Sequence, residues 1–214
     1  MQALIFDAYG TIFKVQMPVA ELEQILGSRS SDFFDLWRTK TLNYTWIRTL
    51  MNAWIPFDQV VENALDFTMA SFAIENEDLR TRLLHVYLDP VCFPEVESFL
   101  NKYYSLGFQM AILSNGTAPM LEMGTKQNKI DAFFTHLFSA SEVQKFKTAP
   151  EVYQLVCNQL EIQKEDIIFF SSNAWDIAGA THFGFNSIWV NRKNTPFDML
   201  GVQPYKQIQH LLEF

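Results

Sequence analysis

The chain has 214 residues, of which 49% are hydrophobic and 19% charged, a balance that fits one globular domain or one core with an insertion. The formal net charge is −8, and no stretch clusters the Lys and Arg residues that a nucleic-acid-binding face needs. No apolar run reaches the roughly 18 residues of a membrane span, and the N-terminus lacks the basic segment of a signal peptide. We therefore expect a cytoplasmic protein that binds neither nucleic acid nor membrane.

The first predicted element is a short buried strand at residues 3–6 (ALIF), which ends at Asp7 and is followed by a turn at residues 9–11. A helical block comes next, in which apolar residues recur at helical spacing without any strand pattern. Its predicted helices cover residues 19–26, 33–51, 60–72 and 79–88.

After Pro90 and Pro94 the pattern changes to strands that alternate with helices. Such alternation predicts a parallel sheet that helices cover on both faces. The predicted strands are residues 109–113, 135–138, 167–170 and 187–190, and the predicted helices are residues 95–104, 150–160, 176–183 and 206–213. We therefore expect an α/β protein with a Rossmann-like core formed by residues 1–14 and 91–214, and an all-helical cap domain, residues 15–90, inserted after the first strand.

Short polar groups follow three of the predicted strands. Asp7 follows the first, Ser114 and Asn115 follow the second, and Ser171 and Asn173 follow a third. In open α/β sheets, ligands bind beyond the carboxyl ends of the strands. The three groups together therefore indicate an active site at this edge of the sheet.

Four motifs, in this order, resemble those of the haloacid dehalogenase superfamily. They are DAYGT at residues 7–11, SNG at residues 114–116, Lys147 followed by PEVY at residues 150–153, and SSNAWD at residues 171–176. Their combination resembles the type II L-2-haloacid dehalogenase subfamily more closely, as do the stretches at residues 36–46 and 179–185. The resemblance implies a hydrolase that converts (S)-2-haloacids to (R)-2-hydroxyacids and halide through an ester on Asp7, and it suggests a homodimer.

The residue two positions after Asp7 separates this chemistry from phosphoryl transfer. Most of the superfamily has a second Asp there, which protonates a leaving alkoxide and helps to hold magnesium, whereas this chain has Tyr9. General acid catalysis is worth on the order of 10² to 10⁴ to an alkoxide leaving group, but a halide leaves as a stable anion. Asp7 and Asp176 beside Lys147 make a poor Mg²⁺ site. We therefore expect neither a metal nor another cofactor.

The resemblance also implies a role for each site residue. Asp7 is the nucleophile, Lys147 keeps it ionised, and Arg38 with Asn173 receives the halide. Support of the catalytic groups is implied for Thr11, Tyr153, Ser171 and Asp176, and either of the last two could activate the hydrolytic water. The carboxylate of the substrate is expected at Ser114, Asn115 and the backbone N–H groups of Ala8 and Tyr9. The alkyl group is expected among Tyr9, Leu42, Phe57 and Trp175.

Three alternatives remain open from the sequence. The first is a Mg²⁺-dependent phosphatase of a small phosphomonoester. The second is a different carbon electrophile at the same site, such as fluoroacetate or an acid with a strained amine ring. The third is a non-catalytic scaffold, which the complete set of catalytic positions disfavours.

Overall fold

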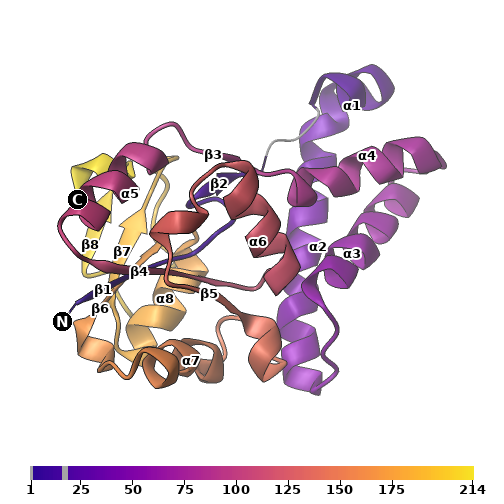
Figure 1. Ribbon diagram of the computed structural model, residues 1–214. Coiled ribbons are helices and arrows are strands. Elements are labelled where there is room, and N and C mark those ends of the chain that lie inside the picture. Colours follow the sequence, from indigo (N-terminus) through magenta and orange to yellow (C-terminus); the bar gives the residue numbers. More distant parts are fainter. Residues whose placement is uncertain (1, 16–18) are drawn as a thin grey trace.

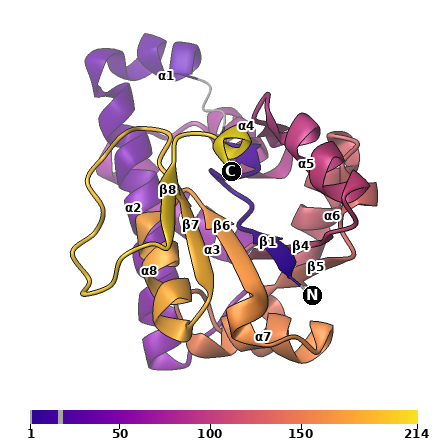
Figure 2. The same cartoon turned by 90° about the vertical axis from the view of Figure 1, so that its left-hand side faces the viewer.

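The computed structural model describes residues 2–15 and 19–214, and within them the core is a six-stranded sheet in the order β5-β4-β1-β6-β7-β8 (Figures 1 and 2). Every neighbouring pair in this sheet is parallel. The strands are β1 (Ala3–Phe6), β4 (Gln109–Ser114), β5 (His136–Ser139), β6 (Ile167–Ser171), β7 (Asn186–Val190) and β8 (Lys206–Ile208). The structure confirms the predicted α/β class.

The central strand β1 is apolar throughout because both of its faces are covered. Leu4 and Phe6 pack into the cluster on one face of the sheet, and Ala3 and Ile5 pack into the cluster on the other. A strand buried on both sides shows a continuous apolar run rather than alternation. Because β1 lies between β4 and β6, Asp7, which follows it, lies near the middle of the sheet at the carboxyl ends of the strands.

Two pairs of helices form these clusters. Residues of α5 (Val96–Ser105) and α6 (Ala118–Gln127) pack in the cluster that holds Leu4 and Phe6. Residues of α7 (Pro150–Leu160) and α8 (Ala174–Phe183) pack in the cluster that holds Ala3 and Ile5. Short 3₁₀ segments complete the fold at Gly27–Arg29, Asp131–Phe133, Ala140–Val143, Lys164–Asp166 and Leu211–Glu213.

Four helices lie beside the core rather than on the sheet (Figure 1). They are α1 (Val19–Leu26), α2 (Ser30–Met51), α3 (Phe57–Ser71) and α4 (Glu77–Leu88). They share an apolar cluster of their own, into which Met120 and Phe146 of the core also pack. A short antiparallel ribbon of β2 (Phe13–Lys14) and β3 (Val91–Cys92) lies where the chain leaves and re-enters the core.

The helices α1–α4 agree with the predicted helical block. The exact division into residues 1–14 plus 91–214 and residues 15–90 stays a prediction, and residue 1 and residues 16–18 of these ranges lie outside the described residues. Among the described residues, none of the helices is long and apolar enough to cross a membrane.

Two differences from the predicted elements have physical causes. The predicted last helix at residues 206–213 is wrong, because residues 206–208 form β8, which extends the exposed edge of β7, and only a 3₁₀ turn follows. The helix α6 was not predicted, since Gly124 interrupts its apolar spacing. A Cβ at Gly124 would lie 3.0 Å from the Phe13 ring and 3.1 Å from Pro90, so the glycine permits close packing against the ribbon.

Candidate active site

The carboxyl ends of three adjacent strands meet at one edge of the sheet. Strand β1 pairs with β4 and with β6, and Phe6 is opposite both Ile112 and Phe170 in these ladders. The backbone N–H of Asp7 donates to the carbonyl of Phe170 at 2.8 Å, which continues the β6 pairing by one residue. The register therefore brings the polar residues that follow the three strands to the same place, as the sequence predicts.

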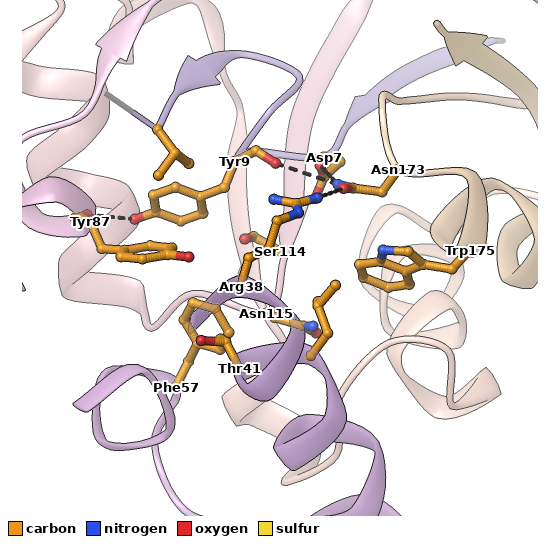
Figure 3. Close-up of a pocket in the computed structure, with 12 residues that line it drawn as sticks. Asp7, Tyr9, Arg38, Thr41, Phe57, Tyr87, Ser114, Asn115, Asn173 and Trp175 are labelled. Atoms are coloured by element: carbon orange, nitrogen blue, oxygen red, sulfur yellow. Dashed lines mark hydrogen bonds between the residues drawn. The ribbon is translucent and has the colours of Figure 1, made fainter. Parts of the chain in front are cut away.

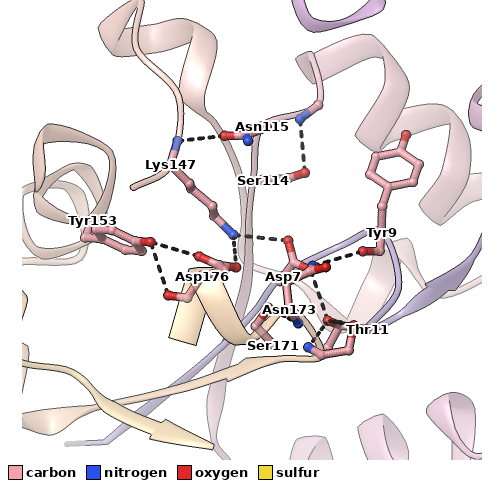
Figure 4. Close-up of polar contacts among 12 residues, drawn as sticks. Asp7, Tyr9, Thr11, Ser114, Asn115, Lys147, Tyr153, Ser171, Asn173 and Asp176 are labelled. Atoms are coloured by element: carbon pink, nitrogen blue, oxygen red, sulfur yellow. Dashed lines mark hydrogen bonds and ion pairs between the residues drawn. The ribbon is translucent and has the colours of Figure 1, made fainter. Parts of the chain in front are cut away.

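Lys147 points into this site and contacts two carboxylates (Figure 4). Its Nζ lies 3.1 Å from Oδ1 of Asp7 and 2.8 Å from Oδ2 of Asp176, and the residue is only 1% exposed. Its backbone N–H donates to Oδ1 of Asn115 at 2.9 Å, which fixes the loop. Burial alone would lower the pKa of Lys147, but Asp176 and Asp7 outweigh it, so the pKa is raised and the ammonium persists.

Asp176, at the start of α8, is fully buried and shares the ammonium with Asp7. Its Oδ1 accepts a hydrogen bond from the Tyr153 hydroxyl at 2.9 Å. Burial raises the pKa of Asp176 to about 6, with Lys147 acting against this rise and Asp7 adding to it. Burial and then Asp176 raise the pKa of Tyr153 well above its usual value, so this phenol stays a neutral donor. A carboxyl group with such a pKa can exchange a proton near neutral pH.

The two oxygens of Asp7 have different surroundings. Oδ2 accepts from Oγ1 of Thr11 and from Nδ2 of Asn173, both at 3.0 Å. Oδ1 accepts from Lys147 alone among the described residues. Thr11 is itself fixed, because its Oγ1 accepts from the backbone N–H of Ser172 at 2.8 Å. The carboxylate is therefore held in one orientation, with a lone pair of Oδ1 left uncommitted.

Arg38 connects α2 to the core. Its Nη2 donates to Oδ1 of Asn173 at 2.6 Å, so Asn173 bridges Arg38 and Asp7 (Figure 3). The second hydrogen of the Asn173 amide faces the carbonyl of Tyr9 at 3.4 Å. Asn173 was predicted as a halide donor, but in this structure both of its amide hydrogens have protein acceptors.

A narrow cavity of about 50 Å³ lies in front of Asp7, between the core and the helices α2–α4 (Figure 3). The cavity includes most of the predicted substrate-binding residues. Its walls are formed by Asp7, Tyr9, Val15, Arg38, Thr41, Leu42, Phe57, Tyr87, Ser114, Asn115, Asn173 and Trp175. Ala8 and Ser171 do not line it: the carbonyl of Ala8 accepts three backbone N–H groups of the turn, and Oγ of Ser171 accepts from the backbone N–H of Asn173 at 3.2 Å.

Sequence reasoning missed three residues of this wall, which are Val15, Thr41 and Tyr87. Thr41 lies one helical turn after Arg38, so a search along the Arg38 face of α2 would have found it. Tyr87 shows no such signal, because its spacing on α4 is that of an ordinary core residue.

The acidic residues of the site do not form a cluster suited to a metal ion. Among the described residues, no group of three or more His, Cys, Asp or Glu side chains could hold one. The space between Asp7 and Asp176 is taken by the ammonium of Lys147. The positive charge between the two carboxylates is therefore supplied by a side chain of the protein.

Comparison with known proteins gives full-length matches. A model of the haloacid dehalogenase-like hydrolases matches residues 1–184. The (S)-2-haloacid dehalogenase 1 of Pseudomonas sp. (strain CBS-3) is 36% identical over 214 residues, covering 100% of this chain and 94% of that protein. Haloacetate dehalogenase H-2 of Moraxella sp. (strain B) is 35% identical over 205 residues, covering 95% of this chain and 92% of that protein. The structure of L-2-haloacid dehalogenase from Xanthobacter autotrophicus with chloropropionic acid covalently bound matches with a TM-score of 0.88 at 26% identity. The match covers 99% of this chain and 95% of that one.

Proposed function

This chain belongs to the haloacid dehalogenase-like hydrolases, and we propose that it hydrolyses the carbon–halogen bond of small (S)-2-haloacids through an ester on Asp7. The observation that carries the proposal is the buried pair of Asp7 and Lys147, whose charged atoms are 3.1 Å apart. An adjacent ammonium keeps a buried carboxylate ionised, and an ionised carboxylate can act as a nucleophile.

In the first step, Oδ1 of Asp7 attacks the α-carbon of the substrate. The new C–O bond forms as the C–halogen bond breaks, and the halide leaves with the bonding electron pair. Thr11 and Asn173 hold the other oxygen of the carboxylate, so the attacking oxygen is aligned before the substrate binds. Attack in line with the leaving group inverts the α-carbon, so an (S)-2-haloacid gives an (R)-2-hydroxyacid.

Among the residues that the structure describes, none offers an acid at the position where superfamily phosphatases have their second Asp, and a halide needs none. Tyr9 stands where a second Asp would serve, and its hydroxyl donates to the carbonyl of Tyr87 at 3.2 Å. Burial raises the pKa of Tyr9 far above its usual value, so it is a poor acid. Together with the Lys147 ammonium between Asp7 and Asp176, this arrangement disfavours the alternative of a Mg²⁺-dependent phosphatase.

In the second step, water gives a proton to a general base and attacks the ester carbonyl at Cγ of Asp7. The bond between Cγ and the ester oxygen then breaks, and the departing oxygen takes the proton from the base, so the hydroxyacid leaves. The oxygen of water stays on Asp7, and its second proton passes to solvent as the carboxylate is restored. We assign the activation of this water to Asp176, because its carboxylate contacts the same Lys147 ammonium as Asp7 and its pKa of about 6 suits a general base near neutral pH. The Ser171 hydroxyl is much less basic and has a structural contact with the Asn173 backbone. Tyr153 and Lys147 hold Asp176 in place.

The cavity fits a short substrate. Ser114 and Asn115 at the end of β4 supply donors for the substrate carboxylate, with the backbone N–H of Tyr9, the residue of the turn after β1 that lines the cavity. Tyr9, Leu42, Phe57 and Trp175 surround the alkyl group, and Arg38 stabilises the departing halide. A cavity of about 50 Å³ leaves room for only a few heavy atoms, which favours haloacetates and 2-halopropionates.

We also propose that the protein is a homodimer. Ile47, Leu50 and Met51 are exposed on the C-terminal part of α2, with Leu50 83% exposed. A cluster of large exposed apolar side chains is typical of a protein–protein contact. Light scattering should give the dimer mass for the native protein and the monomer mass for Leu50→Lys; a native monomer would rule out this assembly.

The decisive test of the function is halide release from (S)-2-chloropropionate in the presence of EDTA. We expect release with the native protein and none with Asp7→Asn, which has the same shape but is a poor nucleophile. Rapid quenching should show Asp7 with added substrate mass, and labelled water should place heavy oxygen in Asp7. Phosphate release that requires Mg²⁺, without halide release, would refute the proposal.

A further inference from the structure

The leaving halide needs hydrogen-bond donors that Arg38 and Asn173 do not supply in full. Arg38 is one donor, although one of its nitrogens donates to Asn173. Both hydrogens of the Asn173 amide face acceptors, at 3.0 Å on Asp7 and 3.4 Å on Tyr9. A donation from Asn173 to the halide would give up its contact with Asp7 or with the Tyr9 carbonyl. A second donor should therefore exist near Arg38.

Of the other donors on the cavity wall, Ser114 and Asn115 are assigned to the substrate carboxylate, and most of the rest are committed or covered. The Tyr9 hydroxyl donates to the carbonyl of Tyr87 at 3.2 Å, and the Thr41 hydroxyl donates to a backbone carbonyl one turn earlier at 2.9 Å. The indole N–H of Trp175 has no partner within residues 2–15 and 19–214, but the atom is fully covered. The Tyr87 hydroxyl forms no hydrogen bond to any other described residue, although Tyr87 is only 6% exposed.

We propose that the hydroxyl of Tyr87 donates a hydrogen bond to the departing halide beside Arg38, and so contributes to catalysis and to the choice of leaving group. This inference rests on the proposed function. In Figure 3 the Tyr87 ring extends into the cavity with its hydroxyl at the inner end. Burial raises the pKa of Tyr87 while the charge of Arg38 acts against this rise, so the phenol is a neutral donor within range of the Arg38 charge.

Aromatic packing holds this donor in place before the substrate arrives. The Tyr87 ring makes edge contacts with Trp37 and Phe57, with ring centres 5.6 Å and 6.2 Å apart, and lies 5.7 Å from the Tyr9 ring. The hydrogen bond from Tyr9 to the Tyr87 carbonyl fixes the backbone as well. A donor fixed in advance stabilises developing negative charge without reorganisation during the reaction.

The position of Tyr87 also suits the release of halide. Tyr87 lies on the wall of a second cavity of about 540 Å³, which shares Val15, Arg38 and Asn173 with the first. Asp35, Arg192 and Lys193 line this larger space, and Arg192 is paired with Glu95. A halide at Tyr87 and Arg38 therefore lies at the junction of the reaction cavity and a larger cavity.

The test is Tyr87→Phe, which removes the hydroxyl and keeps the ring, with Tyr103→Phe on α5 as a matched control. Single-turnover chloride release from (S)-2-chloropropionate should slow roughly 10- to 100-fold in Tyr87→Phe, because the lost donor acts on charge that develops in the transition state. Bromide release from the bromo analogue should slow less, since bromide accepts weaker hydrogen bonds. Inhibition by chloride should weaken, inhibition by propionate should not change, and Tyr103→Phe should behave as the native protein.

Two results would overturn the inference. One is an unchanged rate of chloride release. The other is an equal slowing for both halides with weaker inhibition by propionate, which would place the hydroxyl at the substrate carboxylate. A native protein that releases no halide would instead refute the proposed function. In that case, chlorine NMR line broadening by the resting protein still tests the site: equal broadening in Tyr87→Phe and native protein would exclude Tyr87 from halide binding.

Discussion

Replacing Lys147 by Met tests the central charge arrangement, because Met is similar in length but uncharged. The ammonium lies 3.1 Å from Asp7 and 2.8 Å from Asp176. At an effective dielectric constant of about 20, each of these contacts corresponds to roughly 5–6 kcal/mol of Coulomb attraction, before the cost of burying the ions. Removing one partner of a buried ion pair costs about 3–5 kcal/mol overall.

The effect on activity follows from the two carboxylates that remain. Without the ammonium, Asp7 and Asp176 cannot both stay ionised in a buried site, so one of them takes up a proton at neutral pH. The single-turnover rate of halide release should fall with the fraction of molecules whose nucleophile is protonated, by roughly tenfold or more at neutral pH. The rate should recover in part as the pH rises, because the second carboxylate then ionises.

Thermal unfolding supplies the second measurement. A loss of about 3–5 kcal/mol should lower the Tm by roughly 6–20 °C in a protein of this size. Lys145→Met is the control, since Lys145 forms an ion pair with Glu151 at 3.0 Å at the surface. Such pairs contribute about 0–1 kcal/mol. The reasoning is refuted if Lys147→Met keeps native activity and loses no more stability than Lys145→Met.

Three further predictions concern other parts of the site. Hydrolysis of the ester should slow at acidic pH, because Asp176 must be deprotonated to act as a base. The midpoint of this fall in rate should lie below about 6, the pKa of Asp176 in the free protein, because an esterified Asp7 carries no charge to raise that pKa. Quenching the trapped ester at different times after a pH jump measures the rate of hydrolysis. Arg38→Lys should slow halide release roughly tenfold or more while the fold persists, because an ammonium cannot donate to Asn173 and a halide in the same geometry; single-turnover kinetics with circular dichroism will show this. Phe57→Ala should admit 2-halobutanoates and lower the free energy of unfolding by about 3–5 kcal/mol, which substrate profiles and urea unfolding will measure.

The sequence predicted the framework well where local signals are strong. The apolar run before Asp7 became the central strand, and the apolar stretches before Ser114 and Ser171 became its two neighbours. Parallel strands present their carboxyl ends at one edge, so the grouping of the polar residues followed from topology. The tail was wrong because the spacing of Ile208 and Leu211 imitates a helix, whereas pairing with β7 decides the structure there.

The partners of individual atoms could not be predicted in the same way. The role of Asn173 as a halide donor stays a prediction, but no local pattern indicated that this side chain lies between Asp7 and Arg38. Tyr87 gave no functional signal, yet it lines the cavity. Both outcomes depend on how α2 and α4 pack against the sheet edge, which no local pattern records.

The sequence by itself determined the class of fold, the edge of the sheet at which the site forms, and the residue types available there, because these follow from short-range periodicity and from motifs of a few residues. Only the tertiary structure decided which atoms meet. Lys147 and Asp7 are 140 positions apart, and Asn173 and Asp7 are 166 apart. Contacts at such separations are set by the packing of whole elements, and hydrogen bonds depend on distances of a few tenths of an ångström that only this packing fixes.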